Sequence, residues 1–187
     1  GAEIVTFPVR DPLLADTILR EAGYTPRRRP INTTLSISTD AYGDRMANAA
    51  ADLRRAIQEN EIVTLTAVND SLTSTFISAI NRGEYLGAVI GWRPAFASAA
   101  AYFLPLVRSD SPIPAGAGYG NAALDVLLRD AALAPDARQR AALYSAVQAE
   151  ILAGHDLIPL WQGKDSIVYR EGITGVQIEH NSWLRYD

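Results

Sequence analysis

The chain of 187 residues contains no cysteine, which excludes disulfide bonds, catalysis by a thiolate and cysteine-based zinc sites. Its two histidines, His155 and His180, stand far apart and lack the spacing of paired metal ligands. The sequence has no G-x-S-x-G motif, no P-loop and no pair of carboxylates in contrasting surroundings that would suit acid–base catalysis. We therefore expect no metal, no cofactor and no enzymatic activity.

The sequence also has no excess of positive charge, since its formal net charge is −4 at pH 7. Nucleic-acid-binding domains carry a basic face, so no nucleic-acid partner is expected. The one basic cluster, Arg27–Arg29, is expected to form a solvated loop. No segment has the length and apolarity of a transmembrane helix, and the first residues lack the features of a signal peptide. Any export signal is therefore expected outside this sequence.

The composition is that of a folded domain, with 48% hydrophobic and 20% charged residues. At this length we expect one domain or two small ones. Helices are predicted between Asp11 and Gly23, over residues 42–60 and from Ser71 to Gly83. Their buried faces are expected to comprise, in chain order, Leu14, Ile18 and Ala22; Met46, Ala50, Leu53 and Ile57; and Leu72, Phe76, Ile77 and Ile80.

Strands are predicted between these helices, over residues 31–37, 62–68 and 85–92. The third, YLGAVIGW, is apolar almost throughout, as is typical of a strand covered on both faces. Strand and helix patterns that alternate in this way predict βαβ units with a mostly parallel sheet flanked by helices. The expected fold class is therefore α/β.

The second half has a different pattern. Residues 109–121 are rich in proline, glycine and serine and are predicted to form a loop that is functional or marks a lobe boundary. Its GAGYGN sequence follows a proline-rich loop and not a strand, so it lacks the context that a dinucleotide-binding turn requires. Asn121 is expected to cap a helix that ends at Leu133, and Pro135 and Asp136 to begin another that ends near Ala153. Three short strands are predicted at residues 157–162, 166–170 and 176–179.

The aromatic residues are the most distinctive part of the composition. Core packing is the simplest role for most of them, but Trp92 ends a predicted buried strand and precedes an irregular segment. In parallel α/β sheets, ligands bind at the carboxyl ends of the strands. Trp92 is therefore a candidate for the wall of a ligand pocket as well as for the core.

The order of segments resembles the C-terminal lobe of the family 5 extracellular solute-binding proteins, the peptide, dipeptide and nickel receptors of ABC importers. The resemblance rests on LLADTILREAGYTP from Leu13, GEYLGAVIGW from Gly83 and the run from GYGNAALDVLLRDA to IPLW, which ends at Trp161. Each signal is weak, but their collinear order from Leu13 to the end of the chain is specific.

This resemblance implies a periplasmic-binding-protein-like lobe, of type II in the cluster C style, with extra C-terminal strands. Such receptors are two-lobed, lie outside the cytoplasmic membrane as secreted proteins or lipoproteins, and deliver solutes to ABC permease subunits. Residues 1–187 would then form a single C-terminal lobe whose larger N-terminal partner is missing. The tail, residues 163–187, is expected to belong with that absent lobe.

The sequence departs from the family at the residues expected to touch the ligand. Many peptide-binding members follow this tryptophan with an aspartate that receives the ligand's amino group, yet Ala95 stands in that place and Phe96 replaces the next tyrosine. A second aspartate of the family corresponds to Ser98. The ligand is therefore expected to be a sugar, a modified peptide or an acidic metabolite, and not a peptide with a free amine. The expected ligand-binding residues are Trp92, Arg93, Ala95, Phe96, Tyr119 and Asn121.

Two alternatives remain open at this stage. A glycoside- or peptide-processing enzyme would need an acid pair near the pocket, which the sequence does not display. A sensor, regulatory or structural domain derived from such a lobe would carry an apolar surface for a partner.

Overall fold

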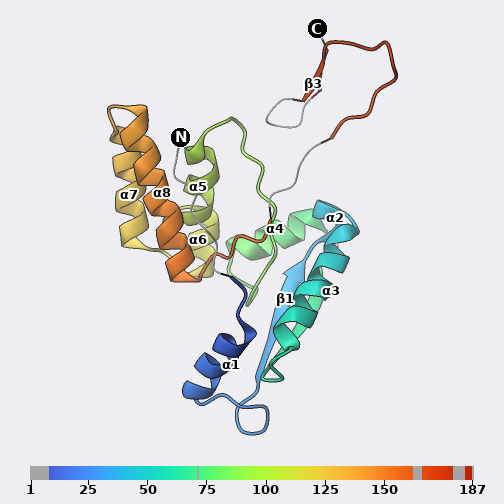
Figure 1. Ribbon diagram of the computed structural model, residues 1–187, viewed down its shortest axis with the longest axis vertical. Coiled ribbons are helices and arrows are strands. Elements are labelled where there is room, and N and C mark those ends of the chain that lie inside the picture. Colours follow the sequence, from blue (N-terminus) through green and yellow to red (C-terminus); the bar gives the residue numbers. More distant parts are fainter. Residues whose placement is uncertain (1–8, 71, 162–165, 179–183, 187) are drawn as a thin grey trace. The chain divides into compact units, whose positions relative to one another are not determined.

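The computed structural model describes residues 9–70, 72–161, 166–178 and 184–186, the last of these without their side chains (Figure 1). The chain divides into two compact units. The sheet unit comprises the described residues up to Gly91 together with Pro112–Gly118. The helical unit comprises Trp92–Ser111 and the described residues from Tyr119 onward.

The sheet unit is built around two parallel strands. β1 (Ile31–Ile37) pairs with β2 (Val63–Asn69) in a register that runs from Ile31 opposite Val63 to Ile37 opposite Asn69. Along the chain, the two strands are connected by α2 (Thr39–Tyr42) and α3 (Arg45–Gln58), and β2 is followed by α4 (Thr73–Asn81). The predicted βαβ order and the parallel sheet are therefore confirmed, and Figure 1 shows α3 beside β1.

The third predicted strand, over residues 85–92, is reduced to a single parallel bridge between Ser36 and Ala88. Two backbone hydrogen bonds form it, from Ser36 N to Gly87 O (2.8 Å) and from Val89 N to Ser36 O (2.9 Å). The prediction of a strand covered on both faces was wrong, since Val89 is buried but Leu86 is 81% exposed. Glycine packs no side chain against neighbouring strands, and Gly87 and Gly91 weaken this segment as a strand.

Met46 and Ala50 of α3 pack against Ile37 and Val89 in the core of the sheet unit, as their helical spacing predicted. Phe76 of α4 is fully buried. Two further members of the predicted α4 face, Leu72 and Ile77, are exposed instead, so that part of the prediction was wrong. The buried residues of α4 are Phe76, Ala79 and Ile80, so only a narrow stripe of the helix is covered, and Leu72 lies before its first turn.

The first helix, α1 (Pro12–Glu21), begins and ends as predicted. The Asp11 side chain accepts a hydrogen bond from Leu14 N (2.9 Å), and Gly23 ends the helix with a left-handed φ of 85°. Its predicted buried face was wrong, because α1 has no buried residue and Leu14 and Ile18 are more than half exposed. Local sequence therefore determined the ends of this helix without determining its packing.

The predicted loop over residues 109–121 contains a short helix, α6 (Pro112–Ala117), which packs against α4. The two backbones approach so closely that a Cβ added to Gly83 would lie 1.9 Å from the carbonyl oxygen of Gly116. A Cβ added to Gly116 would lie 2.1 Å from the carbonyl oxygen of Asn81. Glycine at both positions is therefore a requirement of this contact.

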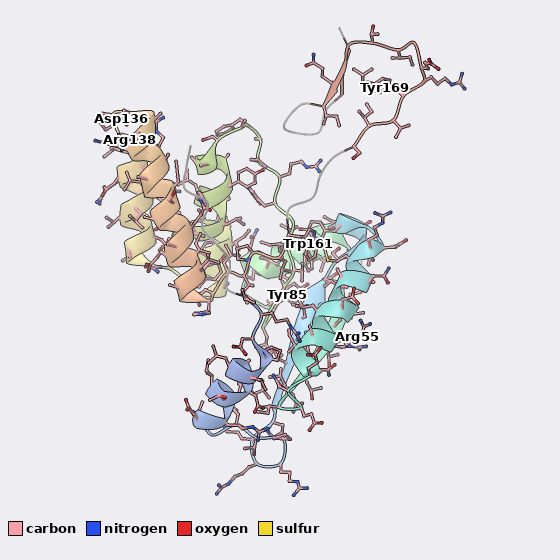
Figure 2. All side chains as sticks on the ribbon, in the orientation of Figure 1. Arg55, Tyr85, Asp136, Arg138, Trp161 and Tyr169 are labelled. Carbon is pink, nitrogen blue, oxygen red and sulfur yellow. The ribbon has the colours of Figure 1, made fainter. Side chains whose placement is uncertain are left out.

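The helical unit contains three packed helices, α5 (Ala99–Val107), α7 (Ala122–Leu133) and α8 (Ala137–Gly154). The caps predicted for the last two are confirmed, since Asn121 and Asp136 accept hydrogen bonds from the first turns of α7 and α8 (Figure 2 labels Asp136). α5 was not predicted. The buried residues of the core are Val107, Leu124, Leu128, Ala131, Tyr144, Val147 and Ile151.

The end of the chain forms fewer strands than predicted. β3 (Val176–Ile178) pairs antiparallel with β4 (Leu184–Tyr186), which confirms the third predicted strand. The described parts of the other two, 157–161 and 166–170, are not strands. Most of their apolar side chains are exposed, including those of Trp161 and Tyr169, both labelled in Figure 2, and no strand among the described residues pairs with either segment. His180, without a predicted role, and part of the tail lie outside the described residues.

Among the helices of the described ranges, none combines the length and the apolar character needed to span a bilayer.

Candidate functional site

Helix α5 supports two of the predicted ligand-binding residues through its backbone carbonyls. The indole Nε1–H of Trp92 donates a hydrogen bond to the carbonyl of Ala101 (2.9 Å), and the hydroxyl of Tyr119 donates to the carbonyl of Leu106 (2.8 Å). The last four carbonyls of a helix lack partners within it, and Leu106 is one of these. The indole N–H of Trp92 and the hydroxyl of Tyr119 are thus both hydrogen-bonded to α5 within the helical unit.

The segment from Trp92 to Phe96 is the most exposed part of the predicted site. Trp92 is 41% and Phe96 57% exposed, and Arg93 and Ala95 are also exposed. Aromatic faces of this kind stack against sugar rings or apolar groups, whereas a guanidinium group binds anions. The segment thus offers two aromatic surfaces and one positive charge next to each other in the chain.

Acidic groups are absent from this part of the sequence. No aspartate or glutamate occurs between Glu84 and Asp110, and Asp110 forms an ion pair with Arg108. A carboxylate is the group that binds an ammonium ion most strongly, through charge-assisted hydrogen bonds. The segment around Ala95 therefore supplies no carboxylate to a ligand.

Tyr119 is half-buried and is fixed at its hydroxyl. Burial, together with the negative charge of Asp156, raises the pKa of Tyr119 to about 12. The phenol is therefore a neutral hydrogen-bond donor across the physiological pH range, and its proton remains on the bond to Leu106.

Asn121 has two structural contacts that the sequence revealed only in part. Its Oδ1 accepts hydrogen bonds from the N–H groups of Ala123 (2.9 Å) and Leu124 (3.4 Å), which is the cap that was predicted. Its Nδ2 donates to Oε1 of Glu150 on α8 (3.1 Å), a link between two helices that no local pattern could reveal. Ligand contact by Tyr119 or Asn121 stays a prediction.

His155, the one histidine in the described ranges, ends α8 in the left-handed region, with φ of 63°. It lies in no group of histidine, cysteine, aspartate or glutamate side chains arranged to hold a metal, and the described residues contain no such group of three.

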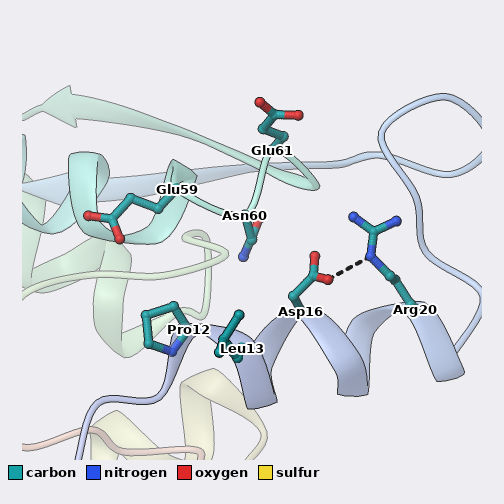
Figure 3. A pocket seen from close by; sticks show the side chains of 7 residues that line it. All are labelled: Pro12, Leu13, Asp16, Arg20, Glu59, Asn60 and Glu61. Atoms are coloured by element: carbon teal, nitrogen blue, oxygen red, sulfur yellow. Dashed lines mark hydrogen bonds and ion pairs between the residues drawn. The ribbon is translucent and has the colours of Figure 1, made fainter.

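A hollow of about 260 Å³ lies on the sheet unit and was not predicted (Figure 3). Its charged side chains largely pair with each other or with neighbours, as Asp16 does with Arg20 (2.6 Å) and Glu59 with Arg10. The hollow is lined by Pro12, Leu13, Asp16, Arg20, Glu59, Asn60 and Glu61. Because these side chains form exposed ion pairs, we assign it no ligand.

Solved structures with a similar fold are solute-binding proteins. The oligopeptide-binding protein OppAIV from Borrelia burgdorferi matches with a TM-score of 0.70 and 21% identity over 81% of this chain and 29% of that chain. OppA from Haemophilus influenzae, in complex with the peptide RPPGFSPFR, matches with a TM-score of 0.68 and 22% identity over 76% of this chain and 27% of its own. The murein tripeptide binding protein MppA from Escherichia coli matches with a TM-score of 0.66 and 23% identity, covering 75% and 26%.

The chain thus spans little more than a quarter of each of these three proteins. No protein-family profile matches it, and no curated protein sequence does. At these identities the likeness establishes the fold, a mixed α/β fold with a small parallel sheet, and confirms the resemblance in fold predicted from the sequence. These neighbours are binding proteins and not enzymes.

Proposed function

We propose that this chain is the C-terminal lobe of the solute-binding component of an ABC importer. The observation that carries the proposal is the fold shared with the oligopeptide- and murein-tripeptide-binding proteins. The collinear order of the family's segments from Leu13 onward supports it independently. The receptor would work outside the cytoplasmic membrane, in the periplasm or as a surface lipoprotein, and would deliver its solute to permease subunits.

The mechanism is closure of two lobes over the ligand. A ligand that contacts both lobes binds the closed state more tightly than the open state, and so shifts the population toward closure. In this lobe the segment from Trp92 to Phe96 would form the wall of the cleft. The exposed rings of Trp92 and Phe96 support this role, because they offer apolar surface that a ligand can cover.

The isolated chain would supply only one side of the cleft and should bind ligand weakly. Titration calorimetry that detected micromolar or tighter binding by the 187-residue chain would contradict this. Residues 163–187 would pack with the N-terminal lobe, a proposal supported by the exposure of Val168 (95%) and Tyr169 (52%). Two permease genes and two ATPase genes beside the coding gene would support the importer assignment.

The ligand we propose is neutral, anionic or blocked at its amino end, such as a sugar, a modified peptide or an acidic metabolite. The support is the absence of acid between Glu84 and Asp110, with Ala95 in the place of the amine-binding aspartate. Arg93 adds positive charge, which disfavours an ammonium group and suits an anion. This wall would therefore recognise its ligand without a carboxylate.

The test is the variant Ala95→Asp in the full receptor, titrated with trialanine and with N-acetyl-trialanine. A charge-assisted hydrogen bond contributes about 1.5–3 kcal/mol, so the variant should gain roughly ten- to a hundredfold in affinity for trialanine but not for its acetylated form. Ala97→Asp, two residues along the same segment, is the matched control and should gain less. Unmodified di- or oligopeptides as the tightest ligands of the unaltered receptor would refute the proposed ligand class.

A further inference from the structure

Helix α5 contains Pro105 at the seventh of its nine positions. Proline has no backbone N–H, so residue 105 cannot donate the helical hydrogen bond to the carbonyl four residues earlier. That carbonyl belongs to Ala101, the same group that accepts the indole N–H of Trp92 at 2.9 Å. We propose that Pro105 is a positioning residue for Trp92, because it leaves the Ala101 carbonyl open to the indole.

The hydrogen bond from Trp92 to Ala101 differs from ordinary helix capping, because Ala101 does not lie in the last turn of α5. Ala101 is the third residue of α5, and in a regular helix its carbonyl would be paired within the helix. The carbonyls of Leu104 and Leu106, which accept from Ser111 and Tyr119, lie in the last turn, where partners outside the helix are the rule. The indole N–H of Trp92 therefore binds a carbonyl that, in a regular helix, would already accept a backbone hydrogen bond.

This contact limits how Trp92 can recognise a ligand. The inference rests on the proposed function in so far as it concerns a ligand. With its only polar atom bound to Ala101, the ring can offer a ligand its apolar face and edge but no hydrogen-bond donor. Phe96, 57% exposed, has no polar side-chain atom. The part of the ligand that lies against these two rings is therefore an apolar group or the face of a ring, and a fixed indole reduces the entropy lost on binding it.

The first test is NMR spectroscopy of the protein labelled with ¹⁵N-tryptophan and free of added ligand. The indole signal of Trp92 is the one lost in Trp92→Phe. In Pro105→Ala the new backbone N–H competes for the Ala101 carbonyl, so this indole should exchange its hydrogen roughly 2- to 12-fold faster than in the unaltered protein. The same exchange rate in both proteins would overturn the proposal. Alanine is the best helix former, so this variant should fold.

The second test is a double-mutant cycle measured by denaturant unfolding. Trp92→Phe keeps a ring but removes the donor, and should raise the unfolding equilibrium constant roughly 2- to 12-fold in the unaltered protein. In the Pro105→Ala background it should raise it by less than half as much. Trp161→Phe is the matched control, since Trp161 has no hydrogen bond among the described residues; its effect should not depend on residue 105.

Equal effects of Trp92→Phe in the two backgrounds would overturn the role of Pro105. Neither test uses a ligand, so the positioning role can stand or fall separately from the proposed solute receptor. A receptor that proved to bind peptides with a free amine would change the ligand assignment but would leave both tests unaffected.

Discussion

Asn121 offers the sharpest test of how the helical unit is held together. The change is Asn121→Ala, which removes the cap of α7 and the hydrogen bond from Nδ2 to Glu150 on α8 (3.1 Å). Loss of a cap costs about 1 kcal/mol, and a partly buried bond to a charged group contributes about 1.5 kcal/mol. We therefore expect a loss of about 2–3 kcal/mol in the free energy of unfolding, or roughly 5–10 °C in Tm for a chain of this size.

Two companion variants separate these contributions. Asn121→Ser keeps a capping oxygen but cannot reach Glu150, and should lose about half as much as Asn121→Ala. Glu150→Ala removes the same link from the other side, so adding Asn121→Ser to it should cost little more. The assay is urea unfolding followed by circular dichroism, with unchanged m-values as a check that the transition is the same. The reasoning would be refuted if Asn121→Ser were as unstable as Asn121→Ala, or if Glu150→Ala had no effect.

Three further predictions concern the core, a titration and a close backbone contact. Phe76→Ala should lower the free energy of unfolding in urea by about 3–5 kcal/mol, because Phe76 is fully buried. Leu72→Ala, a change at an exposed residue nearby, should alter it by no more than about 0.5 kcal/mol. Similar losses in the two variants would contradict the assigned core. With a pKa of about 12 against an ordinary value of about 10, Tyr119 favours the folded state below pH 10, and this stabilisation should be lost between pH 10 and 12. Spectrophotometric titration of phenolate should lose one late-titrating group in Tyr119→Phe, and no such loss would be inconsistent with its burial. Gly83→Ala should lower the free energy of unfolding more than Gly23→Ala, because both glycines have positive φ but only the first change would place a Cβ 1.9 Å from a carbonyl oxygen of α6. Gly23→Ala is the control and should lose about 1–2 kcal/mol. Equal losses in the two variants would exclude the clash.

The sequence by itself determined the features that depend on neighbours along the chain. Asp11, Asn121 and Asp136 each precede a helix, and each caps the helix that was predicted, because a cap requires only a side-chain oxygen within three residues of a free N–H. The β1 and β2 segments were likewise predictable from the pattern of their side chains. The alanine at position 95, on which the proposed ligand class depends, is also a fact of sequence alone, but its meaning depends on a resemblance to other proteins.

Only the tertiary structure decided which apolar faces are buried. Leu14 and Leu86 have the pattern of core residues, yet both are exposed, since burial requires a second surface that no local pattern encodes. The strands predicted at residues 157–162 and 166–170 failed for the related reason that a strand needs a partner for its backbone groups. The bond from Trp92 to Ala101 likewise depends on how a loop meets a helix nine residues further along the chain. The proline that opens this carbonyl is visible in the sequence, but only the packing of the helical unit brings the indole to it.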